Sequence, residues 1–112
     1  MLGRTDAVRV WARARPTDLR LGFVGLVGLV EAELRRDLKG GDLYLFVNRR
    51  RNAARVLLWD GSGLCIYSKR LAVGQFACLW GPGEPGQPLR LTTTELNLFL
   101  EGATRHRSAA SA

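Results

Sequence analysis

The fold depends most on the stretch from Asp42 to Arg70, which reads DLYLFVNRRRNAARVLLWDGSGLCIYSKR. It contains three short apolar runs, each bounded by turn residues, which is typical of β-strands. The predicted strands are 42–48, 55–59 and 64–70. The polar run Arg49–Ala53 predicts the first turn, and Asp60-Gly61-Ser62-Gly63 predicts a tight second turn, because Asp and Gly tolerate positive φ angles. Three strands joined by two short turns predict an antiparallel meander.

Two further strands are expected outside this stretch. Ala7–Arg15 alternates in character, which predicts a strand that ends at Pro16. Its expected inner face carries Val8, Val10 and Ala12. Gln75–Trp80 predicts a shorter strand, and Gly81–Pro88 is a loop because it holds three prolines and three glycines within eight residues. The sheet therefore has about four to five strands.

Two helices are expected, one before the meander in the chain and one after it. The first is long, with Thr17 as its N-cap, Asp18 in its first turn and a stop at Gly40-Gly41. Its apolar stripe consists of Leu19, Phe23, Leu26, Val27, Val30 and Leu34. The second helix opens at Thr92, because Glu95 follows three residues later and completes a capping box. Its stripe is Leu96, Phe99 and Leu100.

Three glycines, Gly22, Gly25 and Gly28, recur at every third position of the first helix. Each costs roughly 1 kcal/mol relative to alanine in a helix interior. We therefore expect a sheet or another helix to approach closely along the glycine face. Together the elements predict one small α+β domain over residues 1–103, and the polar segment 104–112 is expected to be a disordered tail.

The chain is strongly basic. Its 112 residues include 17 lysines and arginines against 10 acidic residues, for a net charge of +7. Only Lys39 and Lys69 are lysines, and the arginine fork suits bidentate contact with phosphate. The bias favours a polyanionic partner, with a generally arginine-rich host composition as the alternative.

No stretch is long enough to cross a membrane, since the richest apolar run, Leu21–Val30, has ten residues. No apolar signal segment is visible at the start, so we expect a cytoplasmic protein without a membrane partner.

Cys65 and Cys78 are isolated and lack zinc-ligand spacing, so we expect two buried thiols and no metal or other cofactor.

Arginines gather at the predicted turn between the first two strands of the meander. Arg49, Arg50, Arg51 and Arg55 lie in or just beyond it, and Lys69 and Arg70 end a neighbouring strand. Crowded positive charges repel each other and lower the stability of the turn. Binding to phosphates would reverse this cost, because the phosphates release their counterions on binding. We therefore predict that these six residues bind DNA. A solvated turn whose arginines pair with Asp42, Asp60 or a partner's acids is the alternative.

Aromatic residues in the strands indicate a second kind of surface. The central strands carry apolar side chains on both faces, which is more apolar surface than one helix layer covers. Trp59 and Tyr67 lie in these strands. We therefore expect Trp59 and Tyr67 at an interface with a protein partner or in a homodimer.

Catalytic patterns are lacking. The acidic residues occur singly, and each has an expected cap, turn or helix-surface role; they include Asp18, Asp42, Asp60, Glu95 and Glu101. Two-metal chemistry needs several carboxylates at one site, and no nucleophile or phosphate-loop motif occurs. The sequence therefore predicts a non-enzymatic protein.

Several segments, in order, resemble one transposon family. These are Thr17-Asp18-Leu19-Arg20-x-Gly22-Phe23-x-Gly25-Leu26, Leu45-Phe46-Val47-Asn48-Arg49-Arg50-Arg51, Val56–Cys65, Lys69-Arg70-Leu71, Gly74-x-Phe76, and Leu91-Thr92 through Gly102. The chain is similar over residues 8–103 to the TnpB-type accessory protein, the second open reading frame product, of the insertion-sequence sixty-six family. It departs at Val24, where the family usually has an acid, at Trp80-Gly81-Pro82, and at Thr104.

The resemblance implies a part in DNA transposition beside a separate transposase that carries the catalytic carboxylates. It supplies no catalytic residue set. Two functions follow as hypotheses: contact with transposon-end DNA through the arginine-rich hairpin, or an adaptor that binds and stabilises the transposase without touching DNA.

Overall fold

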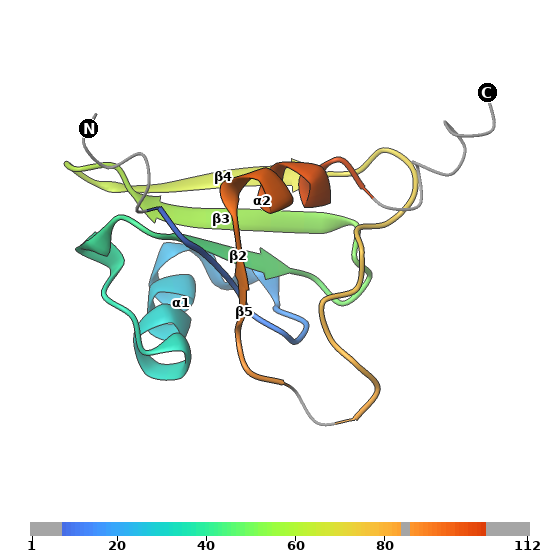
Figure 1. Cartoon of the computed structure of the whole chain (residues 1–112), viewed down its shortest axis with the longest axis horizontal. Helices are drawn as coiled ribbons and strands as arrows, with labels where there is room; N and C mark the ends of the chain where they lie inside the picture. Colours follow the sequence, from blue (N-terminus) through green and yellow to red (C-terminus); the bar gives the residue numbers. More distant parts are fainter. Residues whose placement is uncertain (1–7, 84–85, 103–112) are drawn as a thin grey trace.

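A computed structural model describes residues 8–83 and 86–102 of the chain (Figure 1). Its centre is a five-stranded sheet with the strand order β4-β3-β2-β1-β5. The strands are β1 (Val10–Ala12), β2 (Leu43–Val47), β3 (Ala53–Trp59), β4 (Leu64–Arg70) and β5 (Leu89–Leu91). Two helices pack on this sheet, so the predicted α+β class is confirmed.

The meander of β2, β3 and β4 is confirmed, with both neighbouring pairs antiparallel. Strand β3 begins at Ala53, two residues earlier than predicted. The reason is Asn48, whose side-chain oxygen accepts from the backbone N–H groups of Asn52 and Ala53 at 3.0 and 3.1 Å. This local capping shortens the turn and leaves Arg49 and Arg50 at its exposed tip.

The predicted antiparallel meander of about four to five strands is confirmed for β2, β3 and β4, but the sheet as a whole is mixed. Strand β1 runs parallel to β2, with Val10 opposite Leu43 and Ala12 opposite Leu45. The helical segment between these strands crosses one face of the sheet and returns the chain in the same direction. Strand β1 is also shorter than the predicted Ala7–Arg15.

The prediction for the last strand of the sheet is wrong. Residues 75–80 form no strand, and the fifth strand is Leu89–Leu91, antiparallel to β1. The segment between β4 and β5, gold to orange in Figure 1, runs from one edge of the sheet to the other. Its fully buried Phe76 stacks on Phe99, with ring centroids 5.1 Å apart, so this segment is held by a side chain rather than by strand pairing.

The first helix is broken into shorter pieces than predicted. They are the 3₁₀ turn η2 (Leu19–Leu21), the helix α1 (Gly22–Leu29), the π-helical turn η3 (Val30–Leu34) and a separate 3₁₀ turn η4 (Leu38–Gly40). Arg35, in the left-handed region at φ 57°, ends the helical run. The cap is Asp18, whose carboxylate accepts from the Arg20 N–H, and the predicted cap Thr17 is wrong. Thr17 is buried, and its backbone N–H donates to the Val47 carbonyl at 2.8 Å.

The second helix, α2 (Thr93–Leu100), confirms its prediction. Thr92 accepts from the Glu95 N–H at 3.0 Å, and the Glu95 carboxylate accepts from the Thr92 N–H at 2.8 Å. Both halves of the predicted capping box are therefore present.

Alternating side chains of β2 divide the core between the two faces of the sheet. On one face, which we call the α1 face, Tyr44 and Phe46 pack with Leu26 and Val30. On the other, the α2 face, Leu45 and Val47 pack with buried residues that include Val10, Val56, Phe76 and Leu96. Helix α1 and helix α2 therefore cover opposite faces of the same sheet (Figure 1).

The prediction of two buried thiols is wrong, because Cys65 is half-buried and Cys78 is exposed. Residues 8–83 and 86–102 contain no helix long and apolar enough to span a membrane. The same residues contain no group of three or more His, Cys, Asp or Glu that could hold a metal ion. The predicted tail 104–112 lies outside the described residues.

Candidate nucleic-acid interface

Two of the predicted arginines share one face of the sheet. Arg70 lies directly opposite Ala53 in the β3–β4 pair, and Arg55 lies two residues after Ala53. Residues two apart on a strand, and residues directly opposite on neighbouring strands, point to the same face. Arg55 is also opposite Phe46, whose ring packs under helix α1. Arg55 and Arg70 are therefore diagonal neighbours on the α1 face.

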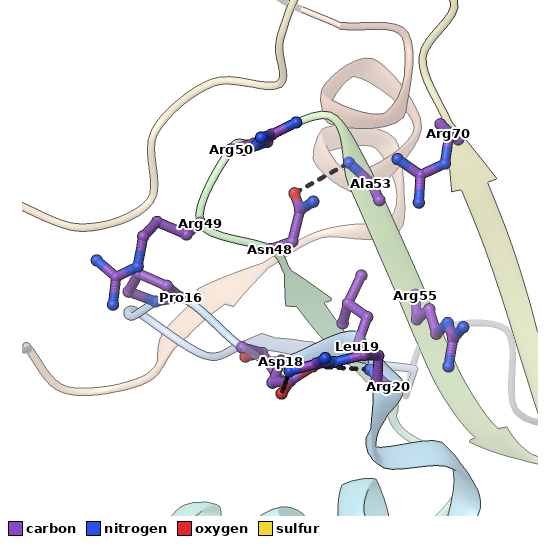
Figure 2. A pocket seen from close by; sticks show the side chains of 11 residues that line it. Pro16, Asp18, Leu19, Arg20, Asn48, Arg49, Arg50, Ala53, Arg55 and Arg70 are labelled. Carbon is purple, nitrogen blue, oxygen red and sulfur yellow. Dashed lines mark hydrogen bonds and ion pairs between the residues drawn. The ribbon is translucent and has the colours of Figure 1, made fainter.

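These arginines line a cleft of about 840 Å³ at the end of the sheet where the β2–β3 turn lies. Figure 2 shows its side chains: Arg49 and Arg50 come from the turn, Arg55 from β3, Arg70 from β4 and Arg20 from the segment that leads into α1. The remaining lining residues are Pro16, Thr17, Asp18, Leu19, Asn48 and Ala53. We call this the basic cleft. Residues from four separate segments build it, which is why sequence spacing reveals only part of it.

Four guanidinium groups in the basic cleft carry uncompensated charge. Within residues 8–83 and 86–102, the guanidinium groups of Arg49, Arg50, Arg55 and Arg70 form no ion pair and donate no hydrogen bond to another residue. Other arginines of the same ranges are neutralised by carboxylates, namely Arg9, Arg13, Arg15, Arg20 and Arg36. Four guanidiniums without a carboxylate partner thus lie around one concave surface, while Arg35 and Arg90, which also form no ion pair in the described part of the chain, lie outside it. The alternative pairing of the turn arginines with Asp42 or Asp60 does not occur.

The acidic residue of the basic cleft is already engaged. Asp18 accepts from Arg20 Nε at 3.0 Å and from Arg20 Nη2 at 2.8 Å. This pairing and the cap to the Arg20 N–H lower the pKa of Asp18 to about 2. Asp18 therefore stays ionised at neutral pH and offsets Arg20 rather than the four other guanidiniums.

Arg51 points away from the basic cleft. Its guanidinium donates to the Phe76 carbonyl at 3.1 Å and to Gln75 Oε1 at 3.4 Å. The Phe76 N–H donates back to the Arg51 carbonyl at 2.7 Å, and Gln75 Nε2 donates to the Arg50 carbonyl at 3.0 Å. Arg51 has a left-handed backbone, at φ 59°. It fastens the turn to the segment after β4 instead of joining the other arginines.

Lys69 lies on the opposite face of the sheet from Arg70, since successive strand residues alternate. It lines a smaller groove of about 600 Å³ between the sheet and helix α2. The other lining residues are Leu43, Val56, Leu58, Tyr67, Leu96, Asn97, Leu100 and Glu101. We call this the α2 groove. The structure therefore divides the six predicted DNA-binding residues into four in the basic cleft, one clamp and one on the other face.

The two predicted interface residues are not neighbours. Tyr67 is opposite Val56 and lies on the α2 face, where its side chain is 51% exposed. Trp59 belongs to the α1 face at the far end of β3, and the Lys39 ammonium lies 5.1 Å from its ring centroid. One flat partner surface cannot contact both side chains.

Sequence reasoning missed Arg20 as a residue of the basic cleft. The Asp18-Leu19-Arg20 segment carries the family resemblance, but it stands 29 residues before Arg49 in the chain. Only the packing of the α1 segment beside the hairpin brings them together.

Three acidic side chains outside the basic cleft have structural roles. Asp42 is buried and accepts from Trp11 Nε1 at 3.0 Å and from the Arg9 N–H at 3.2 Å. Asp60 accepts from the N–H groups of Ser62 and Gly63, which lowers its pKa to about 2. Glu33 accepts two hydrogen bonds of 2.8 Å from Arg13, which lowers the pKa of Glu33.

The fold and cleft thus define a small basic α+β protein with an unpaired arginine surface. Comparison with known proteins gives the family. Residues 8–110 match the family described as IS66 Orf2 like protein, so the chain belongs to this family, as the resemblance predicted. Membership associates it with transposition of an insertion sequence, as an accessory protein.

Curated relatives extend this result without adding an activity. The chain is 33% identical over 102 residues to the uncharacterized proteins y4jC and y4hO of Sinorhizobium fredii (strain NBRC 101917 / NGR234). The alignments cover 91% of this chain and 85% and 86% of those two proteins. No solved structure matches the chain.

Proposed function

We propose that the protein is a non-catalytic accessory factor of transposition that binds DNA phosphates in the basic cleft. The observation that carries the proposal is the convergence of four unpaired guanidiniums, from a hairpin turn and two neighbouring strands, on one concave surface. Arg49, Arg50, Arg55 and Arg70 each offer a planar fork that suits a phosphate oxygen pair. Neutralised phosphates release counterions, which supplies a salt-dependent free energy of binding.

The chemistry of the cleft favours backbone phosphates over bases. Its described lining residues include no aromatic side chain on which an unstacked base could stack. Arginines without a groove-reading helix or ribbon contribute affinity and position but little sequence information. We therefore expect duplex DNA of any sequence to bind with similar affinity, and selection of transposon ends to depend on the transposase.

We infer a non-catalytic role because the carboxylates already form structural hydrogen bonds and ion pairs. Asp42 holds Trp11 and the start of β1, Asp60 caps a turn, and Asp18 pairs with Arg20. These groups are dispersed over the molecule, whereas metal-assisted phosphodiester cleavage needs several carboxylates at one site. The chemical steps are left to the separate transposase.

An adaptor function is the second candidate, and the α2 groove favours it. Tyr67, on the edge strand β4, is 51% exposed and lines this groove with the partly buried Leu58 and Leu100. A transposase segment seated there would be held by apolar contact, and the arginines of the basic cleft would meet an acidic surface.

A salt titration tests the proposal. The purified protein is titrated against labelled terminal-repeat DNA and a scrambled duplex at several salt concentrations. Binding is expected on both duplexes, with a steep dependence on salt. Replacing all four arginines, Arg49→Ala, Arg50→Ala, Arg55→Ala and Arg70→Ala, should reduce the slope of log K against log salt by about 0.9 for each phosphate that is no longer neutralised.

The control is Arg90→Ala, an exposed arginine on β5 outside the basic cleft. The basic cleft would be rejected as the DNA site if the variant that lacks all four arginines kept the slope of log K against log salt unchanged. It would also be rejected if Arg90→Ala lowered this slope by the same amount. Co-purification with the transposase after nuclease treatment, combined with absent DNA binding, would favour the adaptor.

A further inference from the structure

The edge strand β4 directs half of its backbone groups away from the sheet. It is the outermost strand and pairs only with β3 (Figure 1). Just after the strand, the Leu71 N–H donates to the Asn52 carbonyl at 2.9 Å, so the backbone of Leu71 points toward β3. Successive residues of a strand point their backbone groups to opposite sides. Four residues of β4 therefore point outward, where no other described strand pairs with them, namely Leu64, Ile66, Ser68 and Arg70.

Strand β4 lacks the usual features that keep a second strand away from an exposed edge. Its seven residues include no proline, and its register with β3 runs without a bulge from Arg70 to Leu64. The other edge strand, β5, has three residues and begins directly after Pro88. Strand β4 is therefore the edge at which another strand can be added.

The charges of β4 favour an antiparallel second copy of the same strand. Lys69 and Arg70 lie together at its C-terminal end, so a parallel copy would place each of them beside its own equivalent. An antiparallel copy that pairs along the whole strand separates these like charges. It places Lys69 opposite Cys65 of the other copy and Tyr67 opposite itself. All outward-pointing residues are then matched with one another, so this register uses every free backbone group of the strand.

A negative charge lies where Lys69 of the other copy would arrive. Asp60 Oδ2 accepts from Cys65 Sγ at 3.4 Å, and Cys65 shares the α2 face with Lys69. Asp60 Oδ1 accepts from the N–H groups of Ser62 and Gly63, which are neutral donors and leave the carboxylate charge uncompensated. In the described part of the chain, neither Asp60 nor Lys69 forms an ion pair. Two-fold symmetry would bring two such pairs of opposite charges together.

We propose that β4 is the interface of a homodimer, in which two antiparallel copies of this strand join the two sheets into one. Lys69 of each copy lies beside Asp60 of the other, and the exposed Tyr67 rings meet at the two-fold axis. Of the two interface residues predicted from sequence, this dimer places Tyr67 at the axis and not Trp59. The dimer forms without DNA, so this proposal and the DNA proposal can fail separately.

Sedimentation of the full chain without DNA, over a range of micromolar concentrations, tests the dimer. A monomer–dimer equilibrium is expected, and Lys69→Glu should weaken it about tenfold because a carboxylate then faces Asp60 twice. The control is Arg90→Glu, which makes the same change in charge on the other edge strand. Adding Asp60→Asn to Lys69→Glu should restore most of the affinity, since asparagine keeps an acceptor for the turn but removes the repulsion.

Ser68→Pro tests the backbone pairing. The Ser68 N–H points away from β3, so a proline there leaves the β3–β4 pairing intact and removes a donor from the dimer. The dimer should be lost while circular dichroism remains that of the folded monomer. If this variant does not fold, Lys69→Glu still decides the question.

The register is tested by oxidative cross-linking in a Cys65→Ser, Cys78→Ser background. Tyr67 would form a non-hydrogen-bonded pair with itself, whose Cα separation of about 4.5 Å suits a disulfide. Tyr67→Cys should therefore cross-link faster than Ser68→Cys, an adjacent exposed position that is not opposite itself.

Four results would each overturn the homodimer at β4. They are a chain that stays monomeric throughout the range, a dimer unaffected by Lys69→Glu, equal cross-linking at positions 67 and 68, and association that requires added transposase.

Discussion

Arg51 and its neighbour Arg49 show how adjacent residues of one type acquire different roles. Arg49 stands free at the tip of the turn, while Arg51 is hydrogen-bonded to Phe76 and Gln75. These two hydrogen bonds and a left-handed backbone hold Arg51 in place. Its charge is thus used to shape the turn, and that of Arg49 stays available to a ligand.

We predict different salt dependences for these two residues. Arg49→Ala should lower the slope of log K against log salt by about one phosphate contact. Arg51→Ala should weaken DNA binding through a loosened turn but leave the slope unchanged. It should also cost about 1–2 kcal/mol of folding free energy, since it removes hydrogen bonds to partly buried groups. Equal reductions in slope would show that Arg51 contacts DNA directly.

Asp18 limits the charge of the basic cleft. Asp18→Asn retains the cap on the 3₁₀ turn, because asparagine is also a good N-cap, but frees Arg20 from its carboxylate. We expect tighter DNA binding and a slope steeper by about one phosphate contact, measured by the same titration. With the pKa of Asp18 near 2, binding by the unaltered chain should not change between pH 5 and 8 through this group.

Asp37 supplies a matched control for this prediction. It caps the turn η4 through the Lys39 N–H at 3.0 Å, as Asp18 caps η2. Asp37→Asn changes the net charge by the same amount outside the basic cleft. Equal tightening in both variants would assign the effect to total charge instead of to Arg20.

Among the elements, α2 shows that a sequence signal is sufficient to predict a structure when the residues that form it are close together in the chain. The capping box joins residues three apart in the chain, so it can be recognised from sequence without knowing the fold. The helical run after Asp18 shows the opposite. Its apolar stripe is visible in the sequence, but its breaks at Gly22 and Arg35 follow from backbone angles that the stripe does not encode.

The capping box of α2 leads to a prediction about the stability of the fold. Thr92→Ala removes the side-chain acceptor for the Glu95 N–H and should lower the free energy of unfolding by about 1 kcal/mol. Thr94→Ala, at an exposed position inside the helix, should change it by less. Denaturant unfolding of both variants measures the difference, and equal effects would show that the capping box contributes nothing.

Across the whole molecule, Asp42 connects elements that are distant in sequence. It stands just before β2, and its carboxylate holds the backbone of Arg9 and the indole of Trp11 in β1. Arg36, which follows the helical run, lies 3.9 Å from Asp42 and stacks over the Trp11 ring at 4.2 Å from its centroid. The parallel β1–β2 pair is thus secured at one end by a buried carboxylate.

Asp42→Ala should therefore be strongly destabilising. Removal of the carboxylate leaves the Trp11 Nε1–H without its partner in a half-buried site, and we expect a loss of about 2–4 kcal/mol in the free energy of unfolding. Asp60→Ala, at an exposed turn, should cost less. Denaturation midpoints of the two variants test the ranking, and a milder effect at position 42 would contradict it.

Features of this protein with local causes follow from its amino-acid sequence alone. Alternation and turn residues place the meander, the capping box places α2, and ordered motifs identify the family. Other features depend on tertiary packing. The parallel pairing of β1 arises from a crossover, and the separation of Lys69 from Arg70 depends on which face each strand residue meets. The basic cleft unites segments from Pro16 to Arg70, because long-range packing, unlike hydrogen bonding between close neighbours, depends on the whole chain at once.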